Sequence, residues 1–251
     1  MKKIQEIDYS KEIIHVVEKT ITFQGEIFSG QRVFLLRFKD CNRVKGISSF
    51  GDKIKPCPFC DTFEKMNTLE DKEVSIQDIR NIVSDNQCDI MLTGGEPTFG
   101  RNFEETLKII EYTQVDVQIE TNGFDLLSLV SKIHLMASKS EFYIPELIDL
   151  GTKYVFSPKI FSFKELKECI NIAKELNYNN HFYVKLVYQE SPYIITFLQE
   201  ISKLDMNNRV YLMPEGKDKE ELLRNTKKVL EVSNQYHFNF SSRLHILHNF
   251  V

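Results

Sequence analysis

The chain has 251 residues, of which 42% are hydrophobic and 27% charged, and its formal net charge at pH 7 is −4. A chain of this size needs no disulfide or metal for stability, and five cysteines, an odd number, fit a secreted disulfide framework poorly. The slightly negative charge argues against a nucleic-acid-binding protein. Because no apolar run could span a bilayer or serve as a secretory signal, we expect a cytoplasmic protein without a membrane partner.

Short β-rich runs alternate with amphipathic segments along the chain. Runs of β-branched and other apolar residues predict strands at residues 32–38, 89–95, 115–123, 153–159, 182–189 and 209–214. Apolar residues at helical spacing predict helices at residues 75–83, 102–112, 162–176, 193–204 and 217–234. Ser75 and Asn102 can cap the first two helices, and Ser162 with Glu165 forms a capping box at the third.

The repeated β–α units predict an α/β fold with parallel strands and helical crossovers, either an open Rossmann-like sheet or a barrel. Three predicted strands end in polar or glycine-bearing tips, namely "TGGEP" (93–97), "ETNG" (120–123) and "SPK" (157–159). Because the carboxyl ends of parallel strands build the site in such folds, the three tips indicate one functional face. We therefore expect a single domain over residues 1–251.

Cys41, Cys57 and Cys60 follow the first of these strands with the spacing C-x15-C-x2-C. A structural zinc site needs four ligands, usually Cys or His, and no His lies near this stretch. Cys169 falls on the apolar face of a predicted helix and Cys88 precedes a strand, so we expect both to pack in the core. A C-x-x-C motif by itself is compatible with both a zinc site and a redox dithiol. Three thiolates without a fourth suit a [4Fe–4S] cluster in which one iron has no protein ligand. That iron can chelate S-adenosylmethionine, and reduction of the sulfonium then yields a 5′-deoxyadenosyl radical.

The three cysteines and the three tips together resemble the radical S-adenosylmethionine enzymes. More narrowly, "ITFQGEIFSGQRVFLLRFKDCN" (21–42) and "CPFCDT" (57–62) resemble the 7-carboxy-7-deazaguanine synthases, which serve the pathway to queuosine and other 7-deazapurines. The resemblance runs from about Thr20 to the C-terminal "RLHIL". It implies an incomplete, elaborated (β/α) barrel of the radical S-adenosylmethionine type, usually found as a homodimer.

The sequence departs from the family pattern in four places. Within the cluster loop 41–62, residues 42–56 make a long connection where most radical S-adenosylmethionine enzymes have C-x3-C-x2-C. "QGEI" stands where "QGEG" is usual, residues 133–146 look like an insertion, and the chain begins with about a dozen extra residues. These departures concern loop positions and partner contacts rather than the chemistry.

The resemblance implies a role for each residue that matches a family motif. Cys41, Cys57 and Cys60 are implied to hold the [4Fe–4S] cluster. The residues implied to contact S-adenosylmethionine are Phe59, Cys60, Asp61, Gly95, Glu96, Ser157, Pro158 and Lys159. Those implied to bind the substrate, 6-carboxy-5,6,7,8-tetrahydropterin, are Phe23, Gln24, Gly25, Arg37 and Thr93. Thr62 is implied to bind Mg²⁺ through its hydroxyl, although its position also permits a helix cap.

The implied activity is a radical-mediated ring contraction of the carboxypterin with loss of ammonia, which is the reaction of a carbon–nitrogen lyase. Arg37 suits such a substrate because a guanidinium can contact a carboxylate through two hydrogen bonds. An electron donor such as flavodoxin or ferredoxin is the implied protein partner. Two alternatives stay open at this point, a glycyl-radical activating enzyme and a non-enzymatic zinc-binding module.

Overall fold

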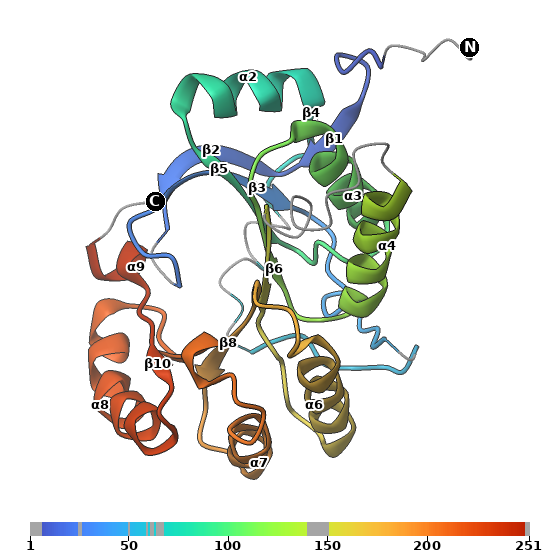
Figure 1. Ribbon diagram of the computed structural model, residues 1–251. Coiled ribbons are helices and arrows are strands. Elements are labelled where there is room, and N and C mark those ends of the chain that lie inside the picture. The colour runs from blue at the N-terminus through green and yellow to red at the C-terminus, as the bar shows by residue number, and fades with distance from the viewer. Residues whose placement is uncertain are drawn as a thin grey trace.

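A computed structural model describes residues 7–24, 27–49, 51–58, 60, 63, 68–139 and 151–248. At its centre is a strongly curved sheet, and helices surround the outer side of that sheet (Figure 1). The sheet has eight strands in the order β10-β9-β8-β7-β6-β5-β3-β2. Its strands are β2 (Glu18–Phe23), β3 (Arg32–Phe38), β5 (Asp89–Gly94), β6 (Val117–Thr121), β7 (Thr152–Phe156), β8 (Phe182–Tyr188), β9 (Val210–Pro214) and β10 (Asn239–Phe240).

The strand pairing is that of an incomplete (β/α) barrel. Every neighbouring pair in the sheet is parallel except β2 and β3, which are antiparallel. All six strands expected from the sequence are present, so the α/β prediction with parallel strands is confirmed. A separate two-stranded antiparallel sheet, which the sequence analysis did not anticipate, pairs β1 (Ile13–Val16) with β4 (Lys72–Ser75).

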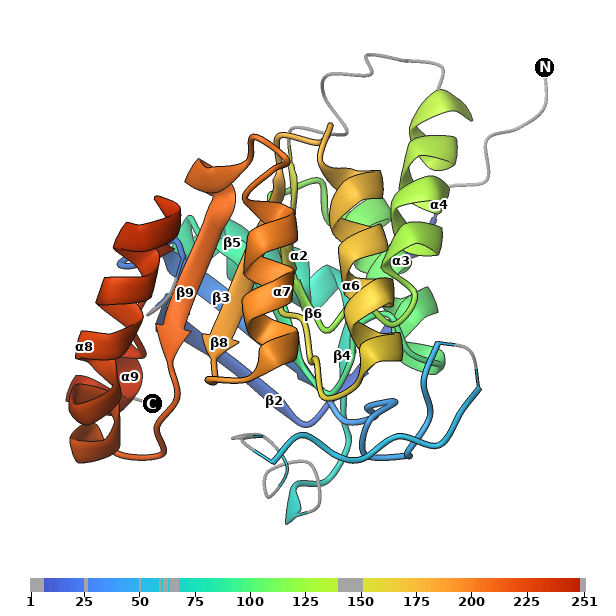
Figure 2. The same ribbon diagram turned by 90° about the horizontal axis from the view of Figure 1, so that it is seen from below.

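Helices form most of the connections between the parallel strands. They are α2 (Ile76–Asn86), α3 (Arg101–Thr113), α4 (Leu126–Lys139), α6 (Phe163–Leu176), α7 (Pro192–Ile201), the 3-10 helix η1 (Asn207–Arg209), α8 (Lys219–Tyr236) and α9 (Leu244–His248). Figure 2 shows α3, α4, α6, α7 and α8 outside the curved sheet. In the same view, the long loop after β3 crosses the edge at which β8 and β9 end.

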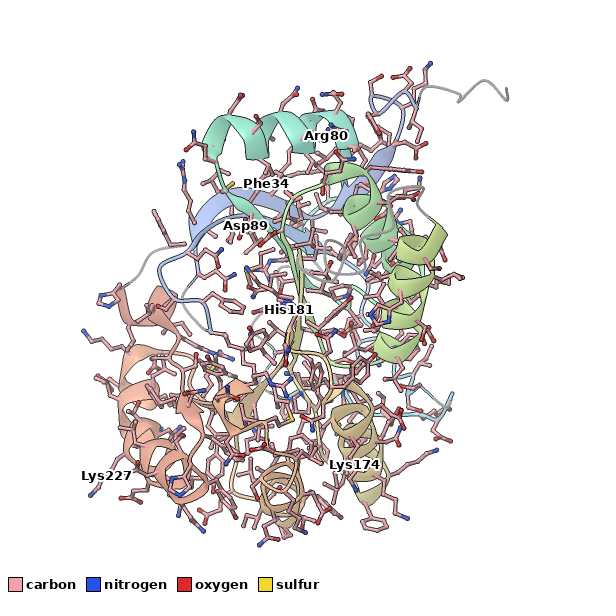
Figure 3. The ribbon with its side chains drawn as sticks, in the orientation of Figure 1. Phe34, Arg80, Asp89, Lys174, His181 and Lys227 are labelled. Carbon is pink, nitrogen blue, oxygen red and sulfur yellow. The ribbon has the colours of Figure 1, made fainter. Side chains whose placement is uncertain are left out.

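The two faces of the sheet differ in character because side chains alternate along a strand. Phe34, Leu36 and other residues of one face belong to the main hydrophobic core, which fills the space between the sheet and the helices. Phe34 lies between β3 and α2, whereas Lys227 on α8 points away from the molecule (Figure 3). On the concave face, Val33 and Leu35 form a small second cluster of buried residues with Met91. The concave face is therefore free to carry polar groups beyond this apolar floor.

The start of α2 forms as its sequence predicts. The Ser75 hydroxyl accepts a hydrogen bond of 3.0 Å from the backbone N–H of Asp78, which satisfies one of the donors that a helix leaves unpaired. Ile76, Ile79 and Val83 are all buried on one face of the helix. The predicted cap and apolar face are both confirmed.

The predicted cap at Asn102 is wrong. Helix α3 begins at Arg101, its N-cap is Gly100, and no side chain caps it. The buried Asn102 amide instead donates to the backbone carbonyls of Asp40 (2.9 Å) and Glu96 (3.0 Å). Buried carbonyls need donors, and this tertiary demand outweighs the local capping preference.

The capping box at α6 forms in a modified way. The Ser162 hydroxyl accepts from the backbone N–H of Glu165 at 3.3 Å, as predicted. The Glu165 carboxylate, however, reaches back to the N–H of Phe161 (2.8 Å) rather than to that of Ser162. The Glu165 carboxylate therefore accepts from the residue before the N-cap, one position closer to the N-terminus than the motif describes.

Two further predictions have a clear outcome. Cys88 and Cys169 are buried, with 8% and 6% of their surface exposed, so the prediction that both pack in the core is confirmed. Residues 133–139, the first half of the predicted insertion, form the last turns of α4, and residues 140–146 lie outside the described residues. The main core runs without interruption from Ile14 to Phe238, in agreement with a single domain, which stays a prediction. No helix that the structure describes combines the length and apolarity needed to cross a membrane.

Candidate active site at the carboxyl edge of the sheet

The three predicted strand tips meet at the carboxyl edge of the sheet. The backbone N–H of Gly95 donates to the carbonyl of Phe38 at 2.8 Å, which joins the tip after β5 to the end of β3. The N–H of Ser157 donates to the carbonyl of Thr121 at 2.7 Å, which joins the tip after β7 to that of β6. The expectation of one shared face for "TGGEP", "ETNG" and "SPK" therefore agrees with the geometry.

Glu96 ties the first two tips together. One oxygen of its buried carboxylate accepts from the Thr98 hydroxyl (2.7 Å) and the Thr121 hydroxyl (2.5 Å), and the other accepts from the N–H of Asn122 (2.7 Å). Burial raises the pKa of Glu96, while the hydroxyls of Thr121 and Thr98 and the Asn122 N–H favour its charged form. The carboxylate holds the β5 and β6 tips in register and keeps lone pairs for a further donor.

Gly94 and Gly95 allow the backbone of the cysteine loop to approach this tip. Gly94 has a φ of +102°, and a Cβ there would lie 2.7 Å from the carbonyl oxygen of Phe38. A Cβ on Gly95 would collide with the carbonyl oxygen of Asp40, the residue before Cys41. Any side chain at Gly95 would therefore push the first cysteine away from the tip.

The three cysteines lie on the loop that crosses this edge. Cys41 follows β3 directly, and the N–H of Cys60 donates to the carbonyl of Cys57 at 3.3 Å in a tight turn. All three are free thiols of intermediate exposure. Burial, the Glu96 carboxylate and Cys57 raise the pKa of Cys41 to about 12. Burial also raises the pKa of Cys57, although the cations of Lys159 and Arg43 counteract it.

The mutual effects of the thiols on their pKa values show that they share one electrostatic environment. Among the described residues, no three His, Cys, Asp or Glu side chains lie close enough to hold a single metal ion. In an iron–sulfur cluster each thiolate binds a different iron, so the thiols need not converge on one point. Two cations, Lys159 and Arg43, stand where they would stabilise bound thiolates. The donor set therefore fits such a cluster.

The "SPK" tip places its lysine beside the cysteine loop. The Lys159 ammonium donates to the Ser157 hydroxyl at 2.9 Å and lies close enough to Cys57 to lower the pKa of that thiol. Pro158 is buried between them. The tip thus offers a hydroxyl and a cation next to the predicted cluster position, while the roles of these residues stay predictions.

The predicted substrate residues Arg37 and Thr93 are register partners on β3 and β5, on the concave face. Arg37 already has an anionic partner, because its Nε donates to the Glu18 carboxylate of β2 at 2.6 Å. Glu18 faces Arg37 in the β2–β3 register. A ligand carboxylate at Arg37 would therefore share the guanidinium with the Glu18 carboxylate.

A polar network continues along the concave face. The Gln24 amide donates to Gln118 at 2.5 Å, and the Thr93 hydroxyl donates to the Glu120 carboxylate at 3.3 Å. Lys185 of β8, only 5% exposed, donates to the other Glu120 oxygen at 2.9 Å. The network brings donors, acceptors and a buried ion pair to one region of the barrel interior.

The remaining predicted residues fall into two groups. Phe23 is described and is 56% exposed, at the end of the edge strand β2. The predictions for Gly25, Phe59, Asp61 and Thr62 lie outside the described residues. None of these five positions has its predicted role tested by the geometry.

Sequence reasoning missed four polar residues of this region, namely Arg43, Gln118, Glu120 and Lys185. Gln118 and Glu120 alternate along β6, so both point to the face opposite Ile119, and this period-two signal was available in the sequence. Lys185 interrupts the otherwise largely apolar strand "FYVKLVY", which is a second usable signal. Arg43 carries no such local signal, because its contacts come from distant segments.

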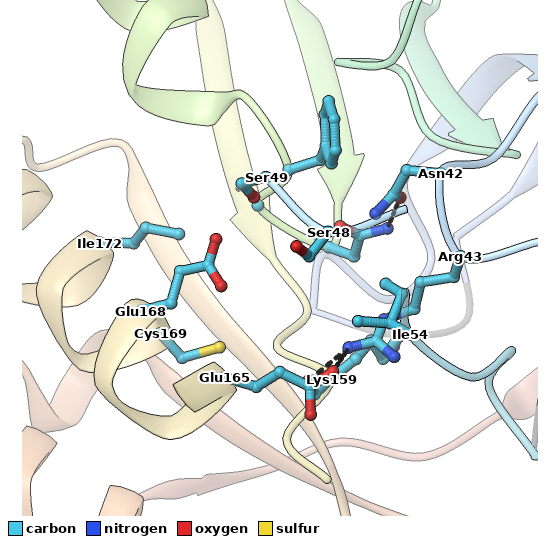
Figure 4. Close-up of a pocket in the computed structure, with 13 residues that line it drawn as sticks. Asn42, Arg43, Ser48, Ser49, Ile54, Lys159, Glu165, Glu168, Cys169 and Ile172 are labelled. Carbon is cyan, nitrogen blue, oxygen red and sulfur yellow. Dashed lines mark hydrogen bonds and ion pairs between the residues drawn. The ribbon is translucent and has the colours of Figure 1, made fainter. Parts of the chain in front are cut away.

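Behind the cysteine loop lies a small pocket (Figure 4). It is bounded by the loop itself, by the segment after β6 and by the first turns of α6. Cys169 lines it, and burial raises the pKa of that thiol. The pocket lies between the long loop and α6, and side chains connect these two segments at its edge.

Two known proteins with similar sequences carry the same name, 7-carboxy-7-deazaguanine synthase. No family model matches the chain. A 7-carboxy-7-deazaguanine synthase of Hyperthermus butylicus is 23% identical over 242 residues, which cover 94% of this chain and 92% of that protein. A protein of the same name from Haemophilus influenzae is 28% identical over 180 residues, which cover 70% of this chain and 66% of that protein.

Solved structures share the fold. QueE from Escherichia coli matches with a TM-score of 0.50 and 16% identity, over 92% of this chain and 93% of that one. Streptococcus suis SuiB with its precursor peptide SuiA matches with a TM-score of 0.51 and 18% identity, over 84% of this chain and 48% of that one. Both proteins share the fold of this chain, so the incomplete, elaborated (β/α) barrel expected from the sequence is confirmed. With relatives of one name aligned over most of its length, the chain is similar to the 7-carboxy-7-deazaguanine synthases, as its sequence motifs indicate.

Proposed function

We propose that the protein converts 6-carboxy-5,6,7,8-tetrahydropterin to 7-carboxy-7-deazaguanine, with ring contraction and loss of ammonia. The proposal rests on the similarity to the 7-carboxy-7-deazaguanine synthases. The observation that carries it is the meeting of the cysteine loop, Glu96 and the "SPK" tip at one edge of the sheet, directly beside a polar concave face. A glycyl-radical activating enzyme would act on a protein, and it gives no reason for this buried polar interior.

Cys41, Cys57 and Cys60 would hold a [4Fe–4S] cluster. When bound, the reduced cluster and S-adenosylmethionine supply the radical that abstracts hydrogen from C6 of the pterin. Lys159 and Arg43 stabilise negative charge at the cysteine loop, since both lower the pKa of Cys57. The peptide chain itself contributes binding, orientation and exclusion of water from the reacting atoms.

The residues proposed to bind S-adenosylmethionine surround the same edge. Glu96 can accept a hydrogen bond from an ammonium group, because its outer carboxylate oxygen has a single donor, the Asn122 N–H, among the described residues. Gly95 permits close approach of a ligand to the backbone, and Ser157 and Lys159 provide a hydroxyl and a cation. Phe59, Cys60, Asp61 and Pro158 complete the proposed set.

The polar concave face suits a pterin. Gln24 and Gln118 each offer a donor and an acceptor, and the Glu120 carboxylate accepts from N–H groups such as those of a pterin edge. Arg37 would bind the substrate carboxylate while Glu18 holds its Nε. Phe23, Gly25 and Thr93 are proposed to line the same site.

Magnesium is proposed to bind through the Thr62 hydroxyl, with water and substrate oxygens completing its coordination. Thr62→Val keeps the side-chain shape but removes the oxygen, so it should blunt the Mg²⁺ dependence of turnover and leave the iron content unchanged. A full Mg²⁺ response in this variant would instead assign Thr62 to a helix cap, and its melting temperature would then fall.

The decisive experiment is an assay of the anaerobically reconstituted protein with S-adenosylmethionine, a low-potential reductant, Mg²⁺ and the carboxypterin. We expect one deazapurine carboxylate and one ammonia per turnover. Iron–sulfur absorption without deazapurine formation would refute the substrate assignment. Stoichiometric zinc without iron would refute the radical chemistry and leave the zinc-binding module. Flavodoxin or ferredoxin in place of a chemical reductant tests the proposed partner, and sedimentation tests the proposed homodimer.

A further inference from the structure

The long loop between the first two cysteines is folded on itself. The N–H of Ile47 donates to the carbonyl of Asn42 (2.8 Å), and the N–H of Ile54 donates to that of Gly46 (3.0 Å). Ile47 also pairs with Lys53 in an isolated antiparallel bridge. The loop is therefore a compact unit, and its position on the barrel depends on a few bridging side chains.

Arg43 bridges this unit and the barrel, as does the ion pair between Asp52 of the loop and Lys164 of α6. Its guanidinium donates to the carbonyl of Lys55 (3.2 Å), to the carbonyl of Lys159 (2.8 Å) and to the carboxylate of Glu165 (2.5 Å). It also lies 5.1 Å from the ring centre of Phe161. Figure 4 shows Arg43 reaching across the pocket edge to Glu165 and Lys159. The residue is only 5% exposed, so these partners offset the cost of burying its charge.

The acceptors of Arg43 come from two parts of the predicted site. Lys55 lies two residues before Cys57, and Lys159 is the last residue of the "SPK" tip. Glu165 is itself fixed, because its second oxygen accepts from the N–H of Phe161 and from the Ser162 hydroxyl. One side chain thus connects the cysteine loop, the "SPK" tip and the start of α6.

We propose that Arg43 is a positioning residue that holds the cysteine loop and the "SPK" tip in a fixed relation. The importance of Arg43 for catalysis rests on the proposed function. In that function, Arg43 fixes the position of the "SPK" tip, which contacts S-adenosylmethionine, relative to the cluster. Lysine cannot replace it, because an ammonium is a single point of charge and cannot reproduce a planar fork aimed at three acceptors in different directions. Asn42, whose side chain accepts from Asn122 at 2.8 Å, supports the same docking.

The first test is hydrogen exchange on the full cluster-free chain. Arg43→Lys should speed exchange in peptides covering residues 44–56 by roughly tenfold or more, with peptides of β5 to β8 unchanged. Arg209→Lys is the matched control, because Arg209 also donates to backbone carbonyls, those of Asn177 (2.9 Å) and Asn179 (2.5 Å), but at the amino end of β9. It should leave the loop unchanged. Equal loop exchange in Arg43→Lys and the parent would overturn the proposal.

The second test uses the reconstituted protein. Arg43→Lys should keep the iron content and raise the KM for S-adenosylmethionine several-fold, because the "SPK" tip is no longer held. An unchanged KM beside faster loop exchange would also overturn the positioning role. Should Arg43→Lys fail to fold, Glu165→Gln replaces it in both tests, with the same expected results and the same refuting ones. If no cluster forms even in the parent protein, the proposed function fails. The hydrogen-exchange test on the cluster-free chain then still shows whether Arg43 positions the cysteine loop.

Discussion

At the scale of single residues, the site is built from charged side chains that are paired within the protein. Arg37 is paired with Glu18 at 2.6 Å, and Lys185 with Glu120 at 2.9 Å. The side chains of Lys185 and Glu120 are only 7% and 12% exposed. Burying a charge to this degree is costly unless the charge is paired and hydrogen-bonded, so within each pair the attraction between the two groups offsets their loss of hydration.

The Arg37 pair leads to a kinetic prediction. Arg37→Lys loses one of the two hydrogen bonds proposed between the guanidinium and the substrate carboxylate. A hydrogen bond to a charged group contributes about 1.5–3 kcal/mol. We expect the specificity constant for the carboxypterin to fall roughly tenfold to a hundredfold, mainly through KM. Steady-state kinetics measure this. Glu18→Gln is the control, since it loosens Arg37 without removing the fork and should have a smaller effect. An unaltered specificity constant in Arg37→Lys would move Arg37 out of the site.

The Lys185 pair leads to a stability prediction. Lys185→Met keeps most of the side-chain volume but leaves the Glu120 carboxylate buried without its ammonium partner. Breaking a buried pair in this way costs about 3–5 kcal/mol of unfolding free energy. Urea denaturation measures the change. The double variant Lys185→Met with Glu120→Gln should recover part of the loss, because it removes the unpaired charge, and no recovery would contradict the pairing argument.

The thiol of Cys41 leads to a pH prediction for the cluster-free protein. Because burial, Glu96 and Cys57 raise its pKa from 9.0 to about 12, the thiolate is scarce at pH 8. Its alkylation by iodoacetamide should be far slower than that of a free cysteine peptide. The rate should rise about tenfold per pH unit up to pH 10, without the plateau that a pKa of 9 would produce. Peptide mass spectrometry follows the reaction at this one site, and a plateau near pH 9 would refute the raised pKa.

At the scale of elements, the site is a set of loops that regular structure holds in place. The strand ends supply Gly95, Glu96 and Ser157 at fixed positions, whereas the cysteines lie on a connection without helix or strand around Cys41 and Cys57. Hydrogen bonds to Asp40 and Phe38 attach that connection to the β5 tip. The position of the thiols therefore depends on tertiary contacts more than on local propensity.

The cysteine loop leads to a binding prediction. Cys41→Ala, Cys57→Ala and Cys60→Ala should each lose most of the iron bound on anaerobic reconstitution, because each would remove a cluster ligand. Cys88→Ala and Cys169→Ala are the controls, since both thiols are buried in the core, and they should retain it. Iron and sulfide are quantified per chain. Comparable loss from Cys169→Ala would contradict the assignment of the three ligands.

At the scale of the whole molecule, one sheet separates two environments. Its convex face and the helices enclose the main core, from Ile14 on β1 to Phe238 before β10. Its concave face carries a small apolar floor of Val33, Leu35 and Met91 and then the polar network around Glu120. The same strands therefore supply stability on one side and a binding surface on the other.

The continuous core leads to a folding prediction. Because the main core links elements from both ends of the chain, the cluster-free protein should unfold in one cooperative transition. Far-ultraviolet circular dichroism and tyrosine fluorescence should give coincident urea curves. Two separated transitions would contradict the single domain expected from the sequence.

Local patterns in the sequence were sufficient for the parallel strands, the cap at Ser75 and the burial of Cys88 and Cys169. Each of these depends on periodicity or on neighbours a few residues away. The three polar tips were likewise foreseeable, because the carboxyl ends of parallel strands share one edge. The cysteine spacing and the motifs resemble the 7-carboxy-7-deazaguanine synthases independently of the geometry.

The partners of the polar side chains could not be predicted from local sequence patterns. Asn102 serves two buried carbonyls instead of a helix start, Arg37 is paired with Glu18 across two strands, and Arg43 joins segments more than a hundred residues apart in the chain. Such contacts depend on how distant segments pack, and buried polar groups accept whichever partner that packing brings near. Local sequence patterns were therefore enough to predict the fold class and to suggest the chemistry, whereas the contacts that hold the site together depend on how distant segments pack.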